Sequence, residues 1–253
     1  MKNNQIANYL ATQRIFACEA SQIRAVVNAS VYDDVEIDDF YTLRPAASID
    51  EGIGHIHVQG MLMNGAPKIY EKLGMVTSYD TIKAEIEGAL MAGVGAIVLH
   101  INSGGGSVNG AIELSRYVAS LPVETVAMVT SCACSAAYML ASATNRIVAT
   151  ETAMIGNIGV ILSWYDYTEF MRDMGIEAKA ITNEGATLKS TFHTEPNAEQ
   201  LAFLQESVNE TGEKFKAFVM AQRPEIDAEV FRAGWYSGER ALALGLADEI
   251  SQK

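Results

Sequence analysis

The sequence predicts an α/β protein in which a mostly parallel β-sheet is flanked by helices. Short apolar runs rich in β-branched residues, such as residues 96–101 (AIVLHI), alternate with stretches of helical periodicity, such as residues 79–92. Glycine-rich or small-residue turns at 102–107 and 130–134 join predicted strands to predicted helices. About half of the residues (49%) are hydrophobic and only 19% are charged, which is typical of layered packing around a buried core.

The individual strands and helices follow from these patterns in order. Residues 54–60 alternate as a strand does, and residues 79–92 carry apolar side chains at helical spacing. Asn197 and Gln200 resemble the capping arrangement at the start of a helix, and the apolar face at 201–219 is interpreted as core. The remaining predicted elements are strands at 123–129, 146–150 and 178–182, a helix ending at Val118, a helix opening near Ser135 and a long helix at 198–220.

The chain divides into an N-terminal arm and one larger unit. Residues 1–48 are weakly periodic, carry an acidic patch between Asp33 and Asp39, and contain a break at 44–47. The rest of the chain shows no internal repeat and no low-complexity linker. We therefore predict an arm at 1–48 and a single domain at 49–253.

Charge and hydrophobicity exclude two classes of partner. Eighteen basic and 31 acidic residues give a formal net charge of −13, which would repel nucleic-acid phosphates and anionic membrane surfaces. No stretch reaches the roughly 18 uncharged apolar residues of a membrane span, and the first residues lack the apolar core of a signal peptide. We expect no nucleic-acid partner, no membrane anchor and a cytoplasmic location.

The three cysteines, Cys18, Cys132 and Cys134, do not indicate a zinc site. The C-x-C pair has no second Cys or His cluster nearby that would complete four ligands. Because cysteines outside disulfides are among the most buried residues, we interpret these as buried thiols in a reducing compartment. We expect no metal.

A candidate nucleophile lies in the second small-residue turn. Ser135 is predicted to open a helix, where unpaired backbone N–H groups and the helix dipole favour developing negative charge. The glycines at 104–106 permit close approach of another chain, so the N–H groups of Gly105 and Ala136 are candidate oxyanion-hole donors. Taken alone, Ser135 also fits an ordinary helix N-cap, which is the commoner role of such a serine, and the glycines fit a tight turn.

The candidate general bases are four histidines and one lysine. His55, His57 and His100 lie on predicted strands, where a structural role is commoner, and His193 lies in a predicted loop. Lys189 lies in an uncharged stretch that could bury it and lower its pKa, as base catalysis requires. The alternative is an exposed loop lysine.

An ordered set of motifs resembles the signal peptide peptidase A family of serine peptidases, which also contains phage head-maturation proteases. Five segments between about 53 and 250 match in family order. They are 101–108 (INSGGGSV), similar to the family's D/N-S-P-G-G-S/G-V turn; 134–138 (CSAAY), similar to A-S-G-G-Y; 155–160 (IGNIGV), similar to G-S-I-G-V; 188–190 (LKS), similar to Y-K-S/D; and 235–250, similar to the Y-T-G-x-x-A-x-x-L-G-L-V-D-E block.

The resemblance implies a fold and a mechanism. It implies a ClpP/crotonase-like fold of stacked, mostly parallel sheet units for the peptidase domain at 49–253, and a homo-oligomer. Ser135 would be the acylated nucleophile, Lys189 the general base and then acid, and Gly105 and Ala136 the oxyanion donors. A peptide substrate would bind as an extended strand, and no cofactor is implied.

Three departures from the family pattern surround these residues. Gly104 replaces a proline, and Cys134 with the alanines at 136–137 replaces an alanine and a Gly-Gly pair. Asn157 stands where the family has a serine that helps orient the lysine amine. An Asn carbonyl would accept a hydrogen bond from Lys189 but would favour its charged form, which opposes a lowered pKa.

Several functions remain open at this level. A phage protease that processes capsid or scaffold proteins and an enzyme that degrades cleaved signal peptides are the two peptidase alternatives. A crotonase-type acyl-CoA enzyme would need an acidic or His group near the second turn, where Glu151 is nearest, and would leave Ser135 and Lys189 idle. A catalytically weak or dead scaffold that binds peptides is supported only by Asn157.

Overall fold

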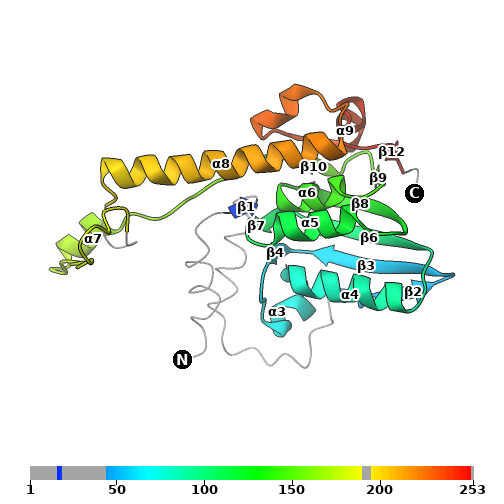
Figure 1. Ribbon diagram of the computed structural model, residues 1–253, viewed down its shortest axis with the longest axis horizontal. Coiled ribbons are helices and arrows are strands. Elements are labelled where there is room, and N and C mark those ends of the chain that lie inside the picture. Colours follow the sequence, from blue (N-terminus) through cyan, green and yellow to red (C-terminus); the bar gives the residue numbers. More distant parts are fainter. Residues whose placement is uncertain (1–15, 19–43, 190–194, 252–253) are drawn as a thin grey trace.

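The computed structural model describes residues 16–18, 44–189 and 195–251, and these form a mixed α/β structure. Its larger sheet has eight strands and a parallel centre, so the predicted α/β class with a mostly parallel sheet is confirmed (Figure 1). The parallel strands are β3 (Ile53–Gln59), β6 (Ala96–Ser103), β8 (Glu124–Cys134), β9 (Arg146–Ala149) and β10 (Met154–Gly156). The remaining strands are β2 (Ser48–Asp50), β11 (Trp235–Tyr236) and β12 (Glu249–Ile250), of which β2 and β11 pair antiparallel.

A smaller sheet lies at the carboxyl edge of the central strands. Its order is β1-β7-β4-β5, in which β7 and β5 pair parallel to β4, and β1 pairs antiparallel to β7. The strands are β1 (Phe16–Cys18), β4 (Met61–Met63), β5 (Val76–Ser78) and β7 (Gly105–Ser107). Because β7 follows β6 after a single residue, the smaller sheet is tied directly to the end of the larger one.

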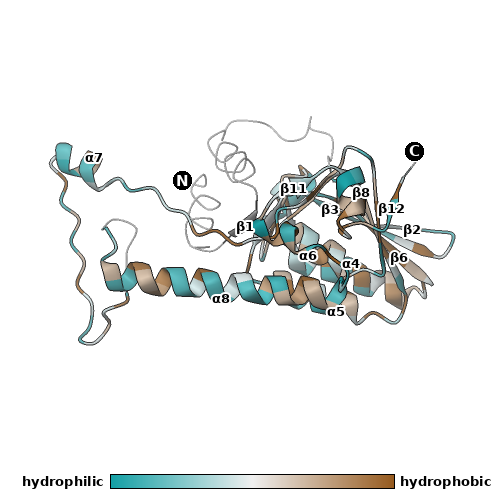
Figure 2. Cartoon of the chain, turned by 90° about the horizontal axis from the view of Figure 1, so that it is seen from above, coloured by the Kyte–Doolittle hydropathy of each residue, from teal (hydrophilic) through white to brown (hydrophobic). Residues whose placement is uncertain are grey.

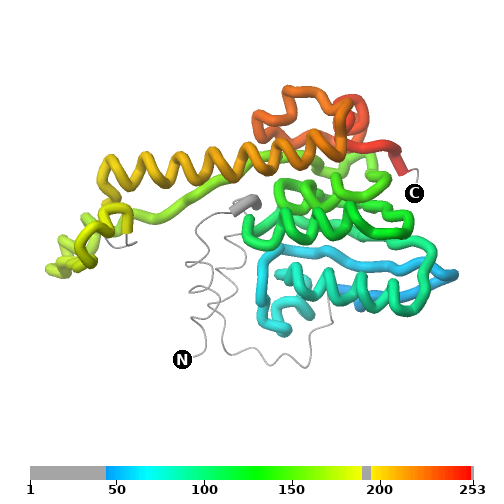
Figure 3. The backbone as a smooth tube through the Cα atoms, viewed as in Figure 1, coloured from blue at the N-terminus to red at the C-terminus, as the bar shows by residue number. Residues whose placement is uncertain are grey.

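Three helices cover one face of the larger sheet. They are α4 (Tyr79–Met91), α5 (Ala111–Ala119) and α6 (Ala136–Ser142) (Figures 1 and 3). The side chain of Ser78 caps α4 by accepting from the Asp80 N–H, and Ile82 and Ile86 are fully buried. The sequence therefore predicted this helix and its buried face correctly.

The long helix α8 (Ala198–Gln222) packs on this body only near its C-terminal end. The predicted cap is confirmed as a capping box between Asn197 and Gln200. Phe215 and Val219 are buried, but Leu201 is 42% exposed, so the prediction that the whole apolar face belongs to the core is wrong. The N-terminal half of α8 projects beyond the sheet together with α7 (Thr168–Asp173) (Figures 1 and 2).

Three other predictions are wrong. Residues 102–107 are not a turn, because 102–103 end β6 and 105–107 form the strand β7. Residues 178–182 form no strand, because they run through the projecting segment where no neighbouring strand is available to pair with them. Residues 130–134 are not a turn but the end of β8, which pairs with β10 there. The shorter helices are α3 (Lys68–Lys72), α9 (Gly238–Ala243) and a 3-10 helix at Ala228–Arg232. The acidic patch of the predicted arm lies outside the described residues.

Candidate active site

Ser135 occupies the sharp junction between β8 and α6. Its backbone has φ 54° and ψ −123°, a conformation that residues other than glycine rarely adopt. The Ser135 N–H donates to the Gly156 carbonyl at 2.8 Å, and its own carbonyl accepts from the Met139 N–H at 2.9 Å. These two bonds hold the strained residue in place, because one fixes it to β10 and the other is the first hydrogen bond of the helix.

The hydroxyl of Ser135 is engaged by a backbone carbonyl. Oγ donates to the carbonyl of Gly159 at 3.2 Å, and the residue is only 1% exposed. A carbonyl oxygen accepts a hydrogen bond but does not take up a proton at neutral pH, so it is no general base. Activation of this serine therefore needs a group that displaces the Gly159 contact.

The glycine turn lies next to this junction. Ser103 of β6 pairs with Ala133 of β8. Two residues beyond this pair lie Gly105 in the first segment and Ser135 in the second. The element that follows Gly105, β7, packs against α6. Gly105 has φ 103°, and its N–H donates to Oγ of Ser103 at 3.1 Å. To act as an oxyanion donor, this N–H would have to exchange the Ser103 hydroxyl for the substrate oxygen.

Ala136 is the first residue of α6 and is buried. The first N–H groups of a helix have no partner within the helix, which leaves them available to an incoming oxygen. The substitution of alanine for glycine at 136–137 leaves both residues buried against the core rather than lining an open space. The structure thus brings Gly105, Ser135 and Ala136 together at the carboxyl edge of the parallel strands.

Asn157 also lies beside this junction. It has φ 51°, its N–H donates to the Gly234 carbonyl at 2.7 Å, and its Nδ2 donates to the Ala233 carbonyl at 3.3 Å. Asparagine tolerates this left-handed conformation better than most residues. These two hydrogen bonds of Asn157 tie the end of β10 to residues 233–234, and neither of them involves Lys189.

Lys189 does not reach Ser135 within one chain. It is exposed in the projecting segment, and its carbonyl accepts from Nε2 of Gln200 in the first turn of α8 at 3.2 Å. Gly159, whose carbonyl accepts from Ser135, lines a different hollow, which is also lined by Gly212 of α8. More than three helical turns, about 18 Å, separate Gln200 from Gly212. Lys189, the base predicted for Ser135, therefore lies beside the N-terminal end of α8, the end that projects from the body (Figure 1).

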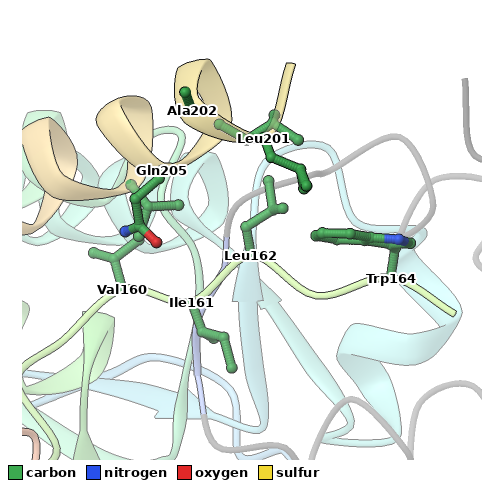
Figure 4. A pocket seen from close by; sticks show the side chains of 9 residues that line it. Val160, Ile161, Leu162, Trp164, Leu201, Ala202 and Gln205 are labelled. Atoms are coloured by element: carbon green, nitrogen blue, oxygen red, sulfur yellow. The ribbon is translucent and has the colours of Figure 1, made fainter. Parts of the chain in front are cut away.

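An apolar hollow of about 590 Å³ lies between the segment after Gly159 and the projecting part of α8 (Figure 4). The sequence did not predict this hollow, although the apolar residues Ile161 and Leu162 directly follow the glycine-rich motif at 155–160. In Figure 4, Leu162 points toward Leu201 of α8, whereas Ile161 points away from the helix. Its lining consists of Val160, Ile161, Leu162, Trp164, Leu201, Ala202, Leu204, Gln205 and Val208.

The cysteines and histidines near the sheet are not arranged as metal ligands. Cys132 and Cys134 are buried thiols, as predicted, and Cys134 Sγ donates to the Met154 carbonyl at 3.6 Å. Among residues 16–18, 44–189 and 195–251, no group of three or more His, Cys, Asp or Glu side chains is placed to hold a metal ion. Over the same ranges, no helix has the length and apolar character needed to cross a bilayer.

Comparison with known proteins identifies the family. The family model described as peptidase family S49 matches residues 119–253, which include Ser135, Asn157 and Lys189. The chain belongs to peptidase family S49. The predicted resemblance to signal peptide peptidase A and to phage head proteases is thereby confirmed at the level of the family, and relatives of both kinds match the chain.

The S49 relatives are longer than this chain. Capsid assembly protease C of Escherichia phage lambda is 29% identical over 207 residues, covering 79% of this chain and 46% of that protein. Head-tail preconnector protein GP5 of Enterobacteria phage P21 is 29% identical over 214 residues, covering 82% and 42%. Probable protease SohB of Haemophilus influenzae is 31% identical over 161 residues, covering 61% and 45%. The chain spans about half the length of these relatives.

Among solved structures, the similarity to this chain is weaker than that of the sequence relatives. An apo enoyl-CoA isomerase from Mtb covers 81% of this chain and 76% of its own at 17% identity and a TM-score of 0.43. A TM-score of this size does not define the fold.

Proposed function

We propose that this S49 chain is a serine endopeptidase in which Ser135 is the nucleophile and Lys189 the general base. The observation that supports it most directly is the strained Ser135 junction, in which a buried hydroxyl lies at the carboxyl edge of a parallel sheet beside a glycine turn. Strained backbone of this kind concentrates at active sites. We also propose that the domain has the ClpP/crotonase-like arrangement of stacked sheets.

The chemistry would proceed through an acyl-enzyme. Neutral Lys189 would take the proton of Ser135 as Oγ attacks the peptide carbonyl, and the resulting oxyanion would accept from the N–H groups of Gly105 and Ala136. Lys189 would then protonate the leaving amine as the C–N bond breaks. A water molecule, activated by the same lysine, would hydrolyse the ester and regenerate the serine. No metal or nucleotide takes part in this scheme.

The separation of Ser135 from Lys189 favours a homo-oligomer in which a second copy completes the site. The segment that carries Lys189 projects from the body and presents apolar side chains to solvent, including Tyr165, Phe170 and Ile181. Exposed apolar surface of this extent marks an association surface. We infer that the projecting part of one chain packs on a neighbouring copy and delivers Lys189 to the neighbour's Ser135.

The names of the relatives suggest two substrate classes. The phage lambda relative is named a capsid assembly protease, and a relative in Enterococcus faecium is named a putative signal peptide peptidase. We propose capsid or scaffold proteins as the substrate, because two phage relatives, named a capsid assembly protease and a head-tail preconnector protein, match 79% and 82% of this chain at 29% identity. We propose that it acts in the cytoplasm.

One observation favours a peptide-binding scaffold as the second candidate. The N–H of Gly105 is held by Ser103 and the Ser135 hydroxyl by Gly159, so neither catalytic group is poised in this chain alone. A chain that never acquires Lys189 from a neighbour would bind peptides without cleaving them.

The proposal is tested with a fluorophosphonate probe and peptide mass spectrometry. We expect an adduct on Ser135 that Ser135→Ala abolishes and that Lys189→Ala reduces at least about a hundredfold. Lys179→Ala is the matched control, because Lys179 is an exposed lysine of the same segment that pairs with Glu177. Mixing Ser135→Ala with Lys189→Ala subunits should restore labelling if the base comes from a second copy. Labelling of folded Lys189→Ala at the wild-type rate would exclude this lysine as the base.

A further inference from the structure

One edge of the strand β7 is paired with β4. Gly106 pairs with Leu62 of β4, and a Cβ at Gly106 would overlap the Leu62 carbonyl. The two backbones therefore approach one another as closely as a glycine allows. An extended peptide that joins this sheet beside the catalytic turn can do so only at the opposite edge of β7.

That opposite edge is occupied by the chain's own N-terminal segment. Residues 16–18 form β1, which pairs antiparallel with β7, so that Phe16 lies opposite Ser107, Ala17 opposite Gly106 and Cys18 opposite Gly105 (Figure 1). The segment therefore runs toward Gly105, the residue that stands beside Ser135. A substrate peptide that paired antiparallel with β7 in this register would likewise run toward the catalytic junction.

We propose that residues 16–18 are a built-in competitor that holds the peptide-docking edge of β7. This inference rests on the proposed function, because it assigns the same edge to substrate. Backbone pairing with an exposed strand edge accepts any extended peptide, so a segment of the same chain and a substrate compete for the same N–H and C=O groups. Because β1 and β7 belong to one chain, β1 competes with substrate as an intramolecular ligand, which favours it over a free peptide of equal intrinsic affinity. Substrate would bind only when β1 leaves the edge.

The first test asks whether β1 holds β7, and it needs no catalytic activity. Hydrogen exchange is measured at the amides of residues 105–107 in the full chain carrying Ser135→Ala. Adjacent N–H groups of a strand point to opposite sides, so the double variant Phe16→Pro/Ala17→Pro must remove one donor that faces β7. We expect exchange to become at least about tenfold faster at the amide of 106–107 that faces β1, whereas the Gly105 N–H, which donates to Ser103, should not respond. If these amides exchange equally fast in the chain without the prolines, β1 does not protect β7 and the inference is overturned. This outcome does not depend on whether Ser135 is catalytic.

A matched double-proline control lies in the same part of the chain. Residues 46–47 are exposed and belong to no helix or strand, so Ala46→Pro/Ala47→Pro introduces the same residues without touching β1. This variant should leave exchange at 105–107 unchanged. A matching acceleration in the control would show that prolines loosen the sheet in general and would count against the specific role of β1.

The second test asks whether release of β1 opens the docking edge. A fluorescent peptide with the sequence of residues 12–22 is titrated into the Ser135→Ala chain with and without Phe16→Pro/Ala17→Pro. We expect the double-proline variant to bind this peptide about tenfold more tightly, because the intramolecular competitor is gone. Equal affinity in both chains would overturn the inference. Ser135 labelling by the fluorophosphonate probe is scored separately, so a failure of the peptidase proposal is distinguished from a failure of this one.

Discussion

Ser135 and Gly159 are joined by a hydrogen bond of 3.2 Å in which the predicted nucleophile donates to a backbone carbonyl. Gly159 follows β10, and β10 also supplies the carbonyl of Gly156 that accepts from the Ser135 N–H. One short segment thus fixes both the backbone and the side chain of the serine. In the peptidase proposed above, a base would have to displace the Gly159 carbonyl before the hydroxyl becomes reactive.

The strain at Ser135 predicts an unusual order of stability among its variants. Glycine adopts φ 54°, ψ −123° without steric cost, whereas alanine keeps the strain of serine and loses the hydroxyl contact with Gly159. Ser135→Gly should therefore be more stable than Ser135→Ala by about 1 to 2 kcal/mol in urea unfolding. In an unstrained position alanine is the more stable of the two, so the opposite order would show that the junction carries no strain.

The sequence predicted this junction well because its information is local. A β-rich run that ends in small residues and is followed by a helical pattern placed Ser135 at a strand-to-helix junction, and the structure has it there. The exact end of β8 was missed. Residues 130–134 contain no large side chains and read as a turn, yet pairing with β10 extends the strand to Cys134. Pairing of that kind depends on a segment some twenty residues away, which local composition does not encode.

The position of Lys189 could not be predicted for a related reason. Nothing in the apolar periodicity of α8 distinguishes a helix that is buried along its whole length from one that is buried only at Phe215, Phe218 and Val219. The projecting half keeps the same pattern, and Leu201 is half exposed. An exposed apolar face and a buried one have the same residue pattern, so the sequence of one chain does not separate the two.

The close approach of β7 to β4 predicts a large effect of a single methyl group. A Cβ at Gly106 would overlap the backbone of Leu62, which lies in a β-pair and has little freedom to move. Gly106→Ala should destabilise the protein by about 3 kcal/mol in urea unfolding. Gly88→Ala is the matched control, because Gly88 is an exposed helical residue with nothing within 4 Å of the new methyl, and should stabilise by about 0.5 to 1 kcal/mol. Equal effects of the two substitutions would contradict the close approach.

The three histidines on the outer face of the sheet predict a loss of stability at mildly acidic pH. His100 stacks between His55 and His57, and His100 Nε2 lies 2.9 Å from His55 Nδ1. Burial lowers the pKa of His57 and of His100; Arg44 adds to the shift at His57, and the neighbouring imidazoles act in the same direction. These groups therefore bind fewer protons in the folded chain than in the unfolded one, where the pKa is about 6.5.

Stability should fall as the pH drops below about 6.5 and should be flat above it, as far as these groups are concerned. The measurement is the urea midpoint at a series of pH values between about 5.5 and 7.5, a range in which carboxylates with ordinary pKa values stay ionised. In the double variant His57→Gln/His100→Gln, the urea midpoint should depend less on pH. If the double variant keeps the full dependence, the histidine stack is not its source.

The ion pair between Arg223 and Asp248 predicts a difference between two neighbouring acidic residues. Nη1 of Arg223 lies 2.7 Å from both carboxylate oxygens of Asp248, which also accepts from the Ile147 N–H at 2.7 Å. The Arg223 side chain is only 10% exposed, so removal of its partner leaves a mostly buried cation and a backbone donor without their acceptor. Asp248→Ala should lower the free energy of unfolding by about 2 to 3 kcal/mol.

The adjacent Glu249 provides the control for this substitution. It pairs with Arg146 at 3.4 Å, and both side chains are more than half exposed, so solvent screens their attraction. Glu249→Ala should lower the free energy of unfolding by less than about 0.5 kcal/mol, measured in the same urea titrations. Because Asp248 joins the C-terminal segment to both β9 and the end of α8, its loss should also speed hydrogen exchange at Ile147, whereas the loss of Glu249 should not. Equal destabilisation by the two substitutions would mean that burial of Arg223 does not set the strength of its pair.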